Sequence, residues 1–229
     1  MCVCSAGQAS TAHGEKGALP LFYRRYPQWS LLGKLVHDAR SAVDLATTGN
    51  GPFYPGHDPP ISIPEFDGDK VFAVGYSVGG MVGLYLAALD NRLAGVVSIN
   101  GFTPLRSDTN TGTAAPTGGV RRLWEWHALQ PRLGWFDGQE EQIPFDFDDV
   151  IVEASKQIPG KSKKATKVLI YQQDYDRTAD AAAVAACVSN AKAAGASVDL
   201  MTAPTVNLLN DNVHRSVIDW LHNHTFQHP

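Results

Sequence analysis

The chain has 229 residues, a formal net charge of −4 and a sequence pI near 6.0. Hydrophobic residues make up 44% of it and charged residues 18%, which suits one globular domain and excludes an intrinsically disordered chain. The acidic balance argues against a nucleic-acid partner, and no apolar run reaches the roughly 18 residues of a membrane-spanning helix. We therefore expect a single domain over residues 1–229, with neither nucleic acid nor membrane as a partner.

The first ten residues have no basic stretch and no apolar stretch, so no secretory signal is visible. The three cysteines, Cys2, Cys4 and Cys187, have neither the spacing of a disulfide framework nor that of a metal site. We expect reduced thiols, a cytoplasmic location, and no metal or cofactor.

Strands and helices are predicted to alternate along most of the chain. Residues 1–29 are expected to be irregular, and residues 30–46 carry one apolar stripe that predicts an amphipathic helix. A loop rich in proline and glycine follows over residues 50–64. Strands are then predicted at residues 71–74, 93–99, 167–171 and 198–201, and helices at residues 79–89, 179–194 and 212–224. This alternation indicates an α/β fold whose sheet is mostly parallel.

Residues 101–164 interrupt the alternation, with a short helix predicted within residues 143–158, and we interpret them as an excursion over the active-site face of the sheet. Their aromatic side chains could wall a substrate pocket, or could pack the excursion onto the sheet: Trp124, Trp126, Trp135 and Phe136. The acidic cluster Asp146, Asp148 and Asp149 alternates with phenylalanines, as in a half-buried segment.

The strongest motif is Gly75-Tyr76-Ser77-Val78-Gly79-Gly80, which directly follows the apolar strand at residues 71–74 and opens a helix. A G-x-S-x-G sequence in that context is typical of a nucleophile elbow, a turn so tight that its flanking positions favour glycine. The helix N-terminus favours the negative charge that develops in acyl transfer. Ser77 is the predicted nucleophile, and the N–H of Val78 is the predicted oxyanion donor.

A nucleophilic serine needs a base and an acid that orients the base, in the chain order Ser, acid, His. Asp174, Asp176 and Asp180 all follow the strand at residues 167–171. Asp176 stands where the acid turn is expected. A place in the first turn of the next helix explains Asp180 better, because a carboxylate there suits the helix dipole.

The base should lie between the last strand and the closing helix, where His214 is the only histidine. A surface histidine beside Arg215 is the alternative interpretation of His214. His127 in the excursion is a second candidate, whereas His222, His224 and His228 are expected to be solvated.

These residues resemble the α/β-hydrolase superfamily, in particular the branch of dienelactone hydrolases and acetyl xylan esterases, and the catalytic domains of prolyl-oligopeptidase-type peptidases. The doubled glycine Gly79-Gly80 and the sequences at residues 25–30, 101–104 and 127–136 carry the resemblance, which spans residues 22–221. It implies the α/β-hydrolase fold with helices on both faces of the sheet.

Three features depart from that family. The His-Gly loop that completes the oxyanion hole is not found before Ser77, and neither are the strands that precede the elbow strand, so we expect an N-terminally truncated sheet. The elbow strand would then form an apolar open edge that invites a second copy or another partner. Asn207 or Leu208 occupies the usual position of the histidine.

The predicted function is that of a serine hydrolase cleaving a small carboxylic ester through Ser77, His214 and Asp176. The alternative is a catalytically inactive or impaired protein of the same fold, a fragment or binding module without a complete oxyanion hole. A peptidase shares the mechanism, and the residues do not separate it from an esterase.

Overall fold

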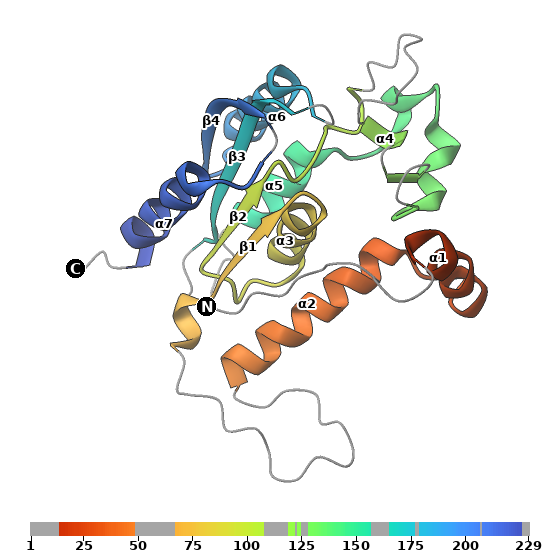
Figure 1. The fold of residues 1–229 in the computed structure, drawn as a ribbon, viewed down its shortest axis with the longest axis horizontal. Coiled ribbons are helices and arrows are strands. Elements are labelled where there is room, and N and C mark those ends of the chain that lie inside the picture. Colours follow the sequence, from red (N-terminus) through yellow and green to blue (C-terminus); the bar gives the residue numbers. More distant parts are fainter. Residues whose placement is uncertain are drawn as a thin grey trace.

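The computed structural model describes most of the chain, and the helices and strands are labelled in Figure 1. The described residues are 14–48, 67–107, 119–121, 123–124, 128–156, 165–176, 179–206 and 208–225. His127, Trp126, His228 and the loop at residues 50–64 lie outside them.

The described strands form one four-stranded sheet in the order β1-β2-β3-β4, and every neighbouring pair is parallel. The strands are β1 (Phe72–Tyr76), β2 (Gly95–Ile99), β3 (Lys167–Tyr175) and β4 (Val198–Val206). Tyr76 pairs with Ile99, and Ile99 with Tyr171, so the strands end close to one another at a common carboxyl edge. The predicted α/β architecture with a parallel sheet is confirmed.

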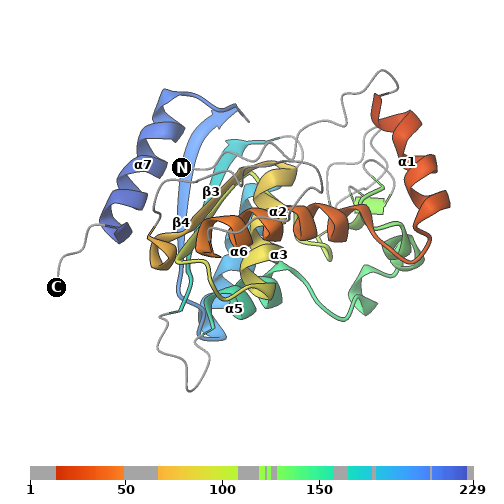
Figure 2. The ribbon, with the colours of Figure 1, turned by 90° about the horizontal axis from the view of Figure 1, so that it is seen from below.

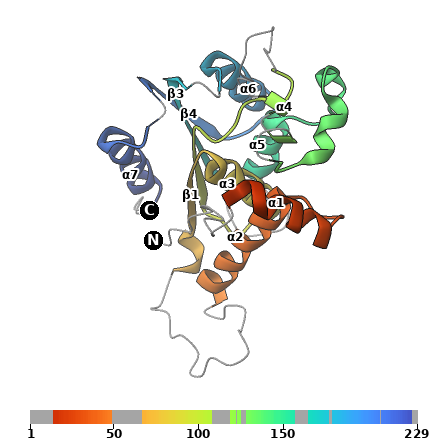
Figure 3. The ribbon, with the colours of Figure 1, turned by 45° about the vertical axis from the view of Figure 1, so that its right-hand side comes forward.

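Helices cover both faces of the sheet (Figure 3). One face packs against α3 (Val78–Leu89), α5 (Phe147–Ser155) and α6 (Ala181–Ala193), and α2 (Leu31–Thr48) lies across the outer side of α3 (Figure 2). The other face packs against α7 (Asp211–Thr225), whose Val213, Val217 and Trp220 meet alternate residues of β2 and β3. The other helical elements are α1 (Gly14–Arg25), α4 (Gly119–Arg121), and 3₁₀ turns at Gly68–Lys70, Pro131–Phe136 and Glu140–Gln142.

Within the described residues, β1 is an edge strand that pairs only with β2. Phe72 and Tyr76 pack against the core beneath α7, but Val74 between them is 49% exposed. The strand holds no charged residue and no proline, which are the usual protections of an edge. The predicted open edge is therefore present in this part of the chain, and a partner that covers it stays a prediction.

The prediction of an irregular segment over residues 1–29 is wrong for residues 14–25, which form α1. Pro20 and two glycines in this stretch are poor helix formers. The tertiary contacts of Tyr23 outweigh them: its hydroxyl donates to the carbonyl oxygen of Ala128 and accepts from the N–H of Leu31 at 3.0 Å.

Three strands extend beyond their predicted ends, β1 by two residues to Tyr76 and the other two further. β3 continues through Gln172 and Gln173, polar residues that are nonetheless buried. β4 continues past Pro204, which an edge strand tolerates because one side of it needs no ladder donor.

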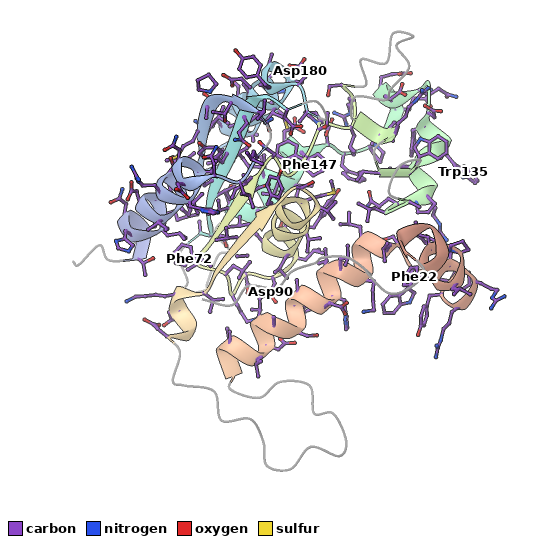
Figure 4. The ribbon with its side chains drawn as sticks, viewed as in Figure 1. Phe22, Phe72, Asp90, Trp135, Phe147 and Asp180 are labelled. Carbon is purple, nitrogen blue, oxygen red and sulfur yellow. The ribbon has the colours of Figure 1, made fainter. Side chains whose placement is uncertain are left out.

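An ionic cluster fastens α2 to the end of α3. Asp90, which caps α3, is 4% exposed and accepts from Arg92 Nε at 2.9 Å (Figure 4). Arg92 also donates to Thr47 Oγ1 at 3.1 Å and pairs with Asp44 at 2.6 Å, both on α2. Burial by itself would raise the pKa of Asp90, but the hydrogen bonds and positive charge of Arg92 outweigh it and lower that pKa below its ordinary value.

No helix among the described residues is long and apolar enough to cross a membrane.

Candidate active site

Ser77 occupies the junction between β1 and α3 in a strained backbone conformation, with φ 53° and ψ −124°. Such angles raise the conformational energy of a non-glycine residue, and they persist only where the surroundings enforce them. Here the Ser77 N–H donates to Ile99 O at 2.9 Å, and Ser77 O accepts from the N–H groups of Gly80 and Met81 at 2.9 and 3.2 Å. The hydroxyl makes no capping hydrogen bond to α3.

The glycines around Ser77 do not all serve the same purpose. A Cβ on Gly75 would lie 2.1 Å from the carbonyl oxygen of Gly79, and one on Gly80 would lie 2.8 Å from Ser98 Oγ. A Cβ on Gly79 would have nothing within 4 Å. The expectation that tightness requires glycine therefore holds at Gly75 and Gly80 and is wrong at Gly79.

Val78 is the first residue of α3. The N–H groups of a helix's first turn have no acceptor within the helix, and the dipole of the helix adds partial positive charge there. The Val78 backbone is thus placed where an oxyanion donor next to Ser77 is needed, and the role of Val78 as that donor stays a prediction.

Asp176 directly follows β3, is 9% exposed, and donates its N–H to Gln173 O at 3.2 Å. Of its two competitors, Asp174 is an exposed residue within β3. Asp180 is the N-cap of α6 and accepts from the Ala182 N–H at 2.9 Å. Asp180 therefore belongs to the start of α6, but as its N-cap and not in the first turn as predicted.

His214 lies in the first turn of α7, where its N–H donates to Asn210 O at 3.0 Å and its side chain is exposed. The expectation of a solvated residue is wrong for His224: its ring lies 4.3 Å from that of Trp220, and its Nδ1 is 2.8 Å from Trp220 O.

Three separate elements bring the predicted residues to one edge of the sheet. Ser77 follows β1, Asp176 follows β3, and His214 follows β4, and all of these strands run in the same direction. Sites in α/β sheets form at this carboxyl edge. The His214 side chain is exposed on α7, and the triad of Ser77, His214 and Asp176 stays a prediction.

A buried amide pair at the same edge was not predicted. Asn100 follows β2 with φ 45°, and its Nδ2 donates to Gln173 Oε1 at 2.6 Å, while its Oδ1 accepts from the Gln173 N–H at 2.9 Å. Both side chains are fully buried. The signal in the sequence was a pair of glutamines between an apolar strand and the acid, where a polar side chain must find internal partners.

The aromatic side chains of the excursion divide between the surface and the core. Trp135 is 86% exposed at the periphery (Figure 4), whereas Trp124 and Phe136 pack against the core. Asp146 forms a capping box with Asp149 at the start of α5 and accepts from the Leu105 N–H at 2.7 Å. The acidic cluster therefore anchors the chain that leaves β2.

The groups that could bind a metal are sparse in the described part of the chain: no three His, Cys, Asp or Glu side chains gather there as a metal site would require. Cys187 is a free thiol within α6, and burial raises its pKa.

No protein-family model matches the chain, and no curated protein matches its sequence. Its fold is similar to several solved structures. One is a carbohydrate esterase family 15 glucuronoyl esterase from Caldicellulosiruptor kristjansonii, with a TM-score of 0.66 at 18% identity over 89% of this chain and 54% of that one. A promiscuous esterase of the same family from a marine bacterial metagenome gives 0.61 at 18% identity over 91% and 53%. A puromycin-hydrolyzing peptidase from Mycobacterium tuberculosis gives 0.54 at 15% identity over 83% and 25%.

The chain spans about half the length of the two esterases. At these identities the similarity concerns the fold alone. The parallel sheet, the helices on both faces and these neighbours together show that the chain has the α/β-hydrolase fold.

Proposed function

We propose that this chain is a serine hydrolase that cleaves a small carboxylic ester through an acyl-Ser77 intermediate. The observation that carries the proposal is the backbone of Ser77, which is held at φ 53° between a parallel strand and a helix N-terminus. Strain of this kind costs about 1–3 kcal/mol and is retained where a side chain must be presented for chemistry.

In the proposed reaction, Ser77 Oγ attacks the ester carbonyl carbon while His214 takes the hydroxyl proton. The Val78 N–H stabilises the oxyanion, and Asp176 orients the imidazole and stabilises its charge. Collapse of the tetrahedral intermediate breaks the bond to the alcohol, which leaves with the proton from His214. Water, deprotonated by His214, then attacks the acyl-serine; the bond to Ser77 Oγ breaks, His214 returns the proton to Oγ, and the acid is released.

The test is hydrolysis of p-nitrophenyl acetate by the wild-type chain and by Ser77→Ala, Asp176→Asn and His214→Gln, with circular dichroism to verify folding. Loss of any member of a triad lowers kcat by about 10⁴-fold or more, and the three losses do not add. Asp174→Asn is the matched control, because Asp174 is an exposed carboxylate on the same strand. Activity that survives Ser77→Ala would refute the proposal.

The substrate class is part of the proposal. Two neighbours in fold are esterases, one of them a glucuronoyl esterase, and a third is a peptidase. The panel therefore includes a glucuronate methyl ester and an aminoacyl amide beside the acetate. Turnover of the amide at a rate similar to that of the esters would replace the esterase proposal by a peptidase.

A second candidate is a hydrolase-fold protein without a working base, and two observations favour it. His214 is exposed on α7. Leu208 is one of the two residues at the usual position of the family's histidine, and hydrogen bonds from Gln173 hold its backbone, so a residue that cannot act as a base is fixed there. The discriminating variant is Leu208→His. If the wild-type chain is inert and this variant gains turnover that Ser77→Ala abolishes, the elbow is intact and only the base is missing.

A further inference from the structure

The Gln173 side chain joins the ends of three strands. Its Oε1 accepts from Asn100 Nδ2 at 2.6 Å and from the Leu208 N–H at 3.0 Å. Its Nε2 donates to Thr205 Oγ1 at 2.8 Å and to Leu208 O at 3.1 Å. Every hydrogen-bonding position of the carboxamide is therefore occupied.

Two of these contacts grip a single residue of the loop between β4 and α7. Because the amide of Gln173 both donates to Leu208 O and accepts from Leu208 N–H, it holds that residue as a neighbouring strand would. Leu208 itself is 56% exposed, so its own side chain contributes little to fixing the loop. The anchoring contact comes from a fully buried partner, where a hydrogen bond is strongest.

Leu208 lies just before the turn that starts α7. Asn210 caps this helix by accepting, through Oδ1, from the N–H groups of Asn212 and Val213, each at 3.1 Å. The Asn210 carbonyl oxygen accepts from the His214 N–H at 3.0 Å. Leu208 therefore lies two residues before the cap of α7, the helix that carries His214.

The backbone of Gln173 reaches the other two predicted residues. Gln173 O accepts from the Asp176 N–H at 3.2 Å, and the Gln173 N–H donates to Asn100 Oδ1 at 2.9 Å. Asn100 directly follows Ile99, whose carbonyl accepts from the Ser77 N–H at 2.9 Å. One residue thus connects the elbow, the acid turn and the loop that leads to the base.

We propose that Gln173 is a positioning residue that holds the β4–α7 loop against the ends of β2 and β3, and so fixes His214 relative to Ser77 and Asp176. This inference rests on the proposed function. Gln173 does not touch the reacting atoms and acts through the loop, so its removal should slow the chemical step without weakening the initial binding of a reagent.

The chain offers a matched control in the adjacent glutamine. Gln172 is also buried in β3, but its Nε2 donates to Gln173 O at 3.1 Å and does not grip the loop. The experiment compares Gln173→Met with Gln172→Met, because methionine keeps the length of the side chain and removes its hydrogen bonds. Both variants are first verified by circular dichroism and thermal melting.

The first readout is phosphonylation of Ser77 by a fluorophosphonate, resolved into the maximal inactivation rate and the half-saturating reagent concentration. For Gln173→Met we expect the maximal rate to fall about 10–100-fold while the half-saturating concentration changes less than about 3-fold, since small displacements of a catalytic group slow the reaction strongly. Gln172→Met should react at nearly the wild-type rate.

The second readout is hydrogen exchange of the Leu208 amide by NMR. Exchange should accelerate in Gln173→Met and stay at the wild-type rate in Gln172→Met. A wild-type inactivation rate in Gln173→Met, or equal losses in both variants, would overturn the inference while leaving the proposed function standing. A wild-type chain that does not react at all would refute the proposed function, and the assigned role of Gln173 with it.

Discussion

The two ends of α3 differ in backbone conformation and in how they are capped. At its N-terminus, Ser77 has φ 53° and makes no capping hydrogen bond to the helix. At its C-terminus, Asp90 is a buried residue in extended backbone that accepts from the Arg92 N–H at 3.1 Å and is paired with the guanidinium of Arg92. The first end contains strain, and the second end is satisfied by charges and hydrogen bonds.

This difference separates function from stability within one helix. The turn that contains Ser77 is closely packed, since a Cβ on Gly75 would lie 2.1 Å from the Gly79 carbonyl oxygen and one on Gly80 would lie 3.0 Å from the Gly75 carbonyl oxygen. The Asp90 cluster ties α3 to α2 and has no group at the carboxyl edge of the sheet. Changes at the elbow should therefore alter both chemistry and stability, and changes at Asp90 should alter stability alone.

The largest effect is expected at Gly75. Gly75→Ala places a Cβ 2.1 Å from the Gly79 carbonyl oxygen, and the backbone must move to admit it. We expect a loss of about 3 kcal/mol or more of unfolding free energy, measured by urea denaturation. Gly79→Ala is the control, because its Cβ meets nothing within 4 Å and alanine favours the helix by up to about 1 kcal/mol. Similar losses in both variants would show that the elbow is not enforced by this contact.

The next effect concerns Asp90 and depends on pH. Replacing Asp90 by Asn removes a buried charged hydrogen bond to Arg92, which we expect to cost about 2 kcal/mol at pH 7. The pKa of Asp90 is lowered in the folded chain, so its contribution is present above the unfolded pKa and disappears as pH falls through the folded value. The wild-type advantage over Asp90→Asn should therefore shrink in acid below about pH 4. An advantage that stays constant down to pH 2 would contradict the ionic account.

A smaller effect of opposite sign is expected at Ser77. Glycine adopts a positive φ without steric cost, so Ser77→Gly should raise the unfolding free energy by about 1 kcal/mol while abolishing esterase turnover. Denaturation and p-nitrophenyl acetate hydrolysis measure the two effects on the same sample. The control is Ser98→Gly, which removes a buried hydroxyl from extended backbone and should destabilise the chain. A destabilised Ser77→Gly variant would mean that the elbow holds no strain.

The smallest effect on stability is expected at the edge of β1. We propose that a second copy of the chain covers this edge, because Val74 is 49% exposed on a strand without charges. Val74→Lys should then convert a dimer to a monomer by light scattering, with a change in unfolding free energy within about 0.5 kcal/mol. Val206→Lys, at a similarly exposed position on β4, is the control. If the wild-type chain is a monomer at high concentration, the proposal that a second copy covers the β1 edge is refuted.

Local signals were sufficient to predict the sheet and most of the helices. The elbow combines a buried strand, a Gly-rich turn and a helix start, and all of these lie within one short segment of the chain. The prediction failed where distant contacts decide: Tyr23 stabilises α1 through a bond to Ala128, and Gln173 extends β3 because Asn100 and Thr205 satisfy it. The proposed role of Gln173 is of the same kind, because its bonds to Leu208 join residues that lie 35 positions apart in the sequence.

Under the proposed function, the strained backbone at the N-terminal end of α3 presents an activated Ser77. The direct test is intact mass after incubation with a fluorophosphonate, with Ser77→Ala and Ser98→Ala as paired variants. We predict a single adduct on the wild-type chain and on Ser98→Ala, and none on Ser77→Ala. A folded wild-type chain without an adduct, or an adduct that persists in Ser77→Ala, would contradict the account.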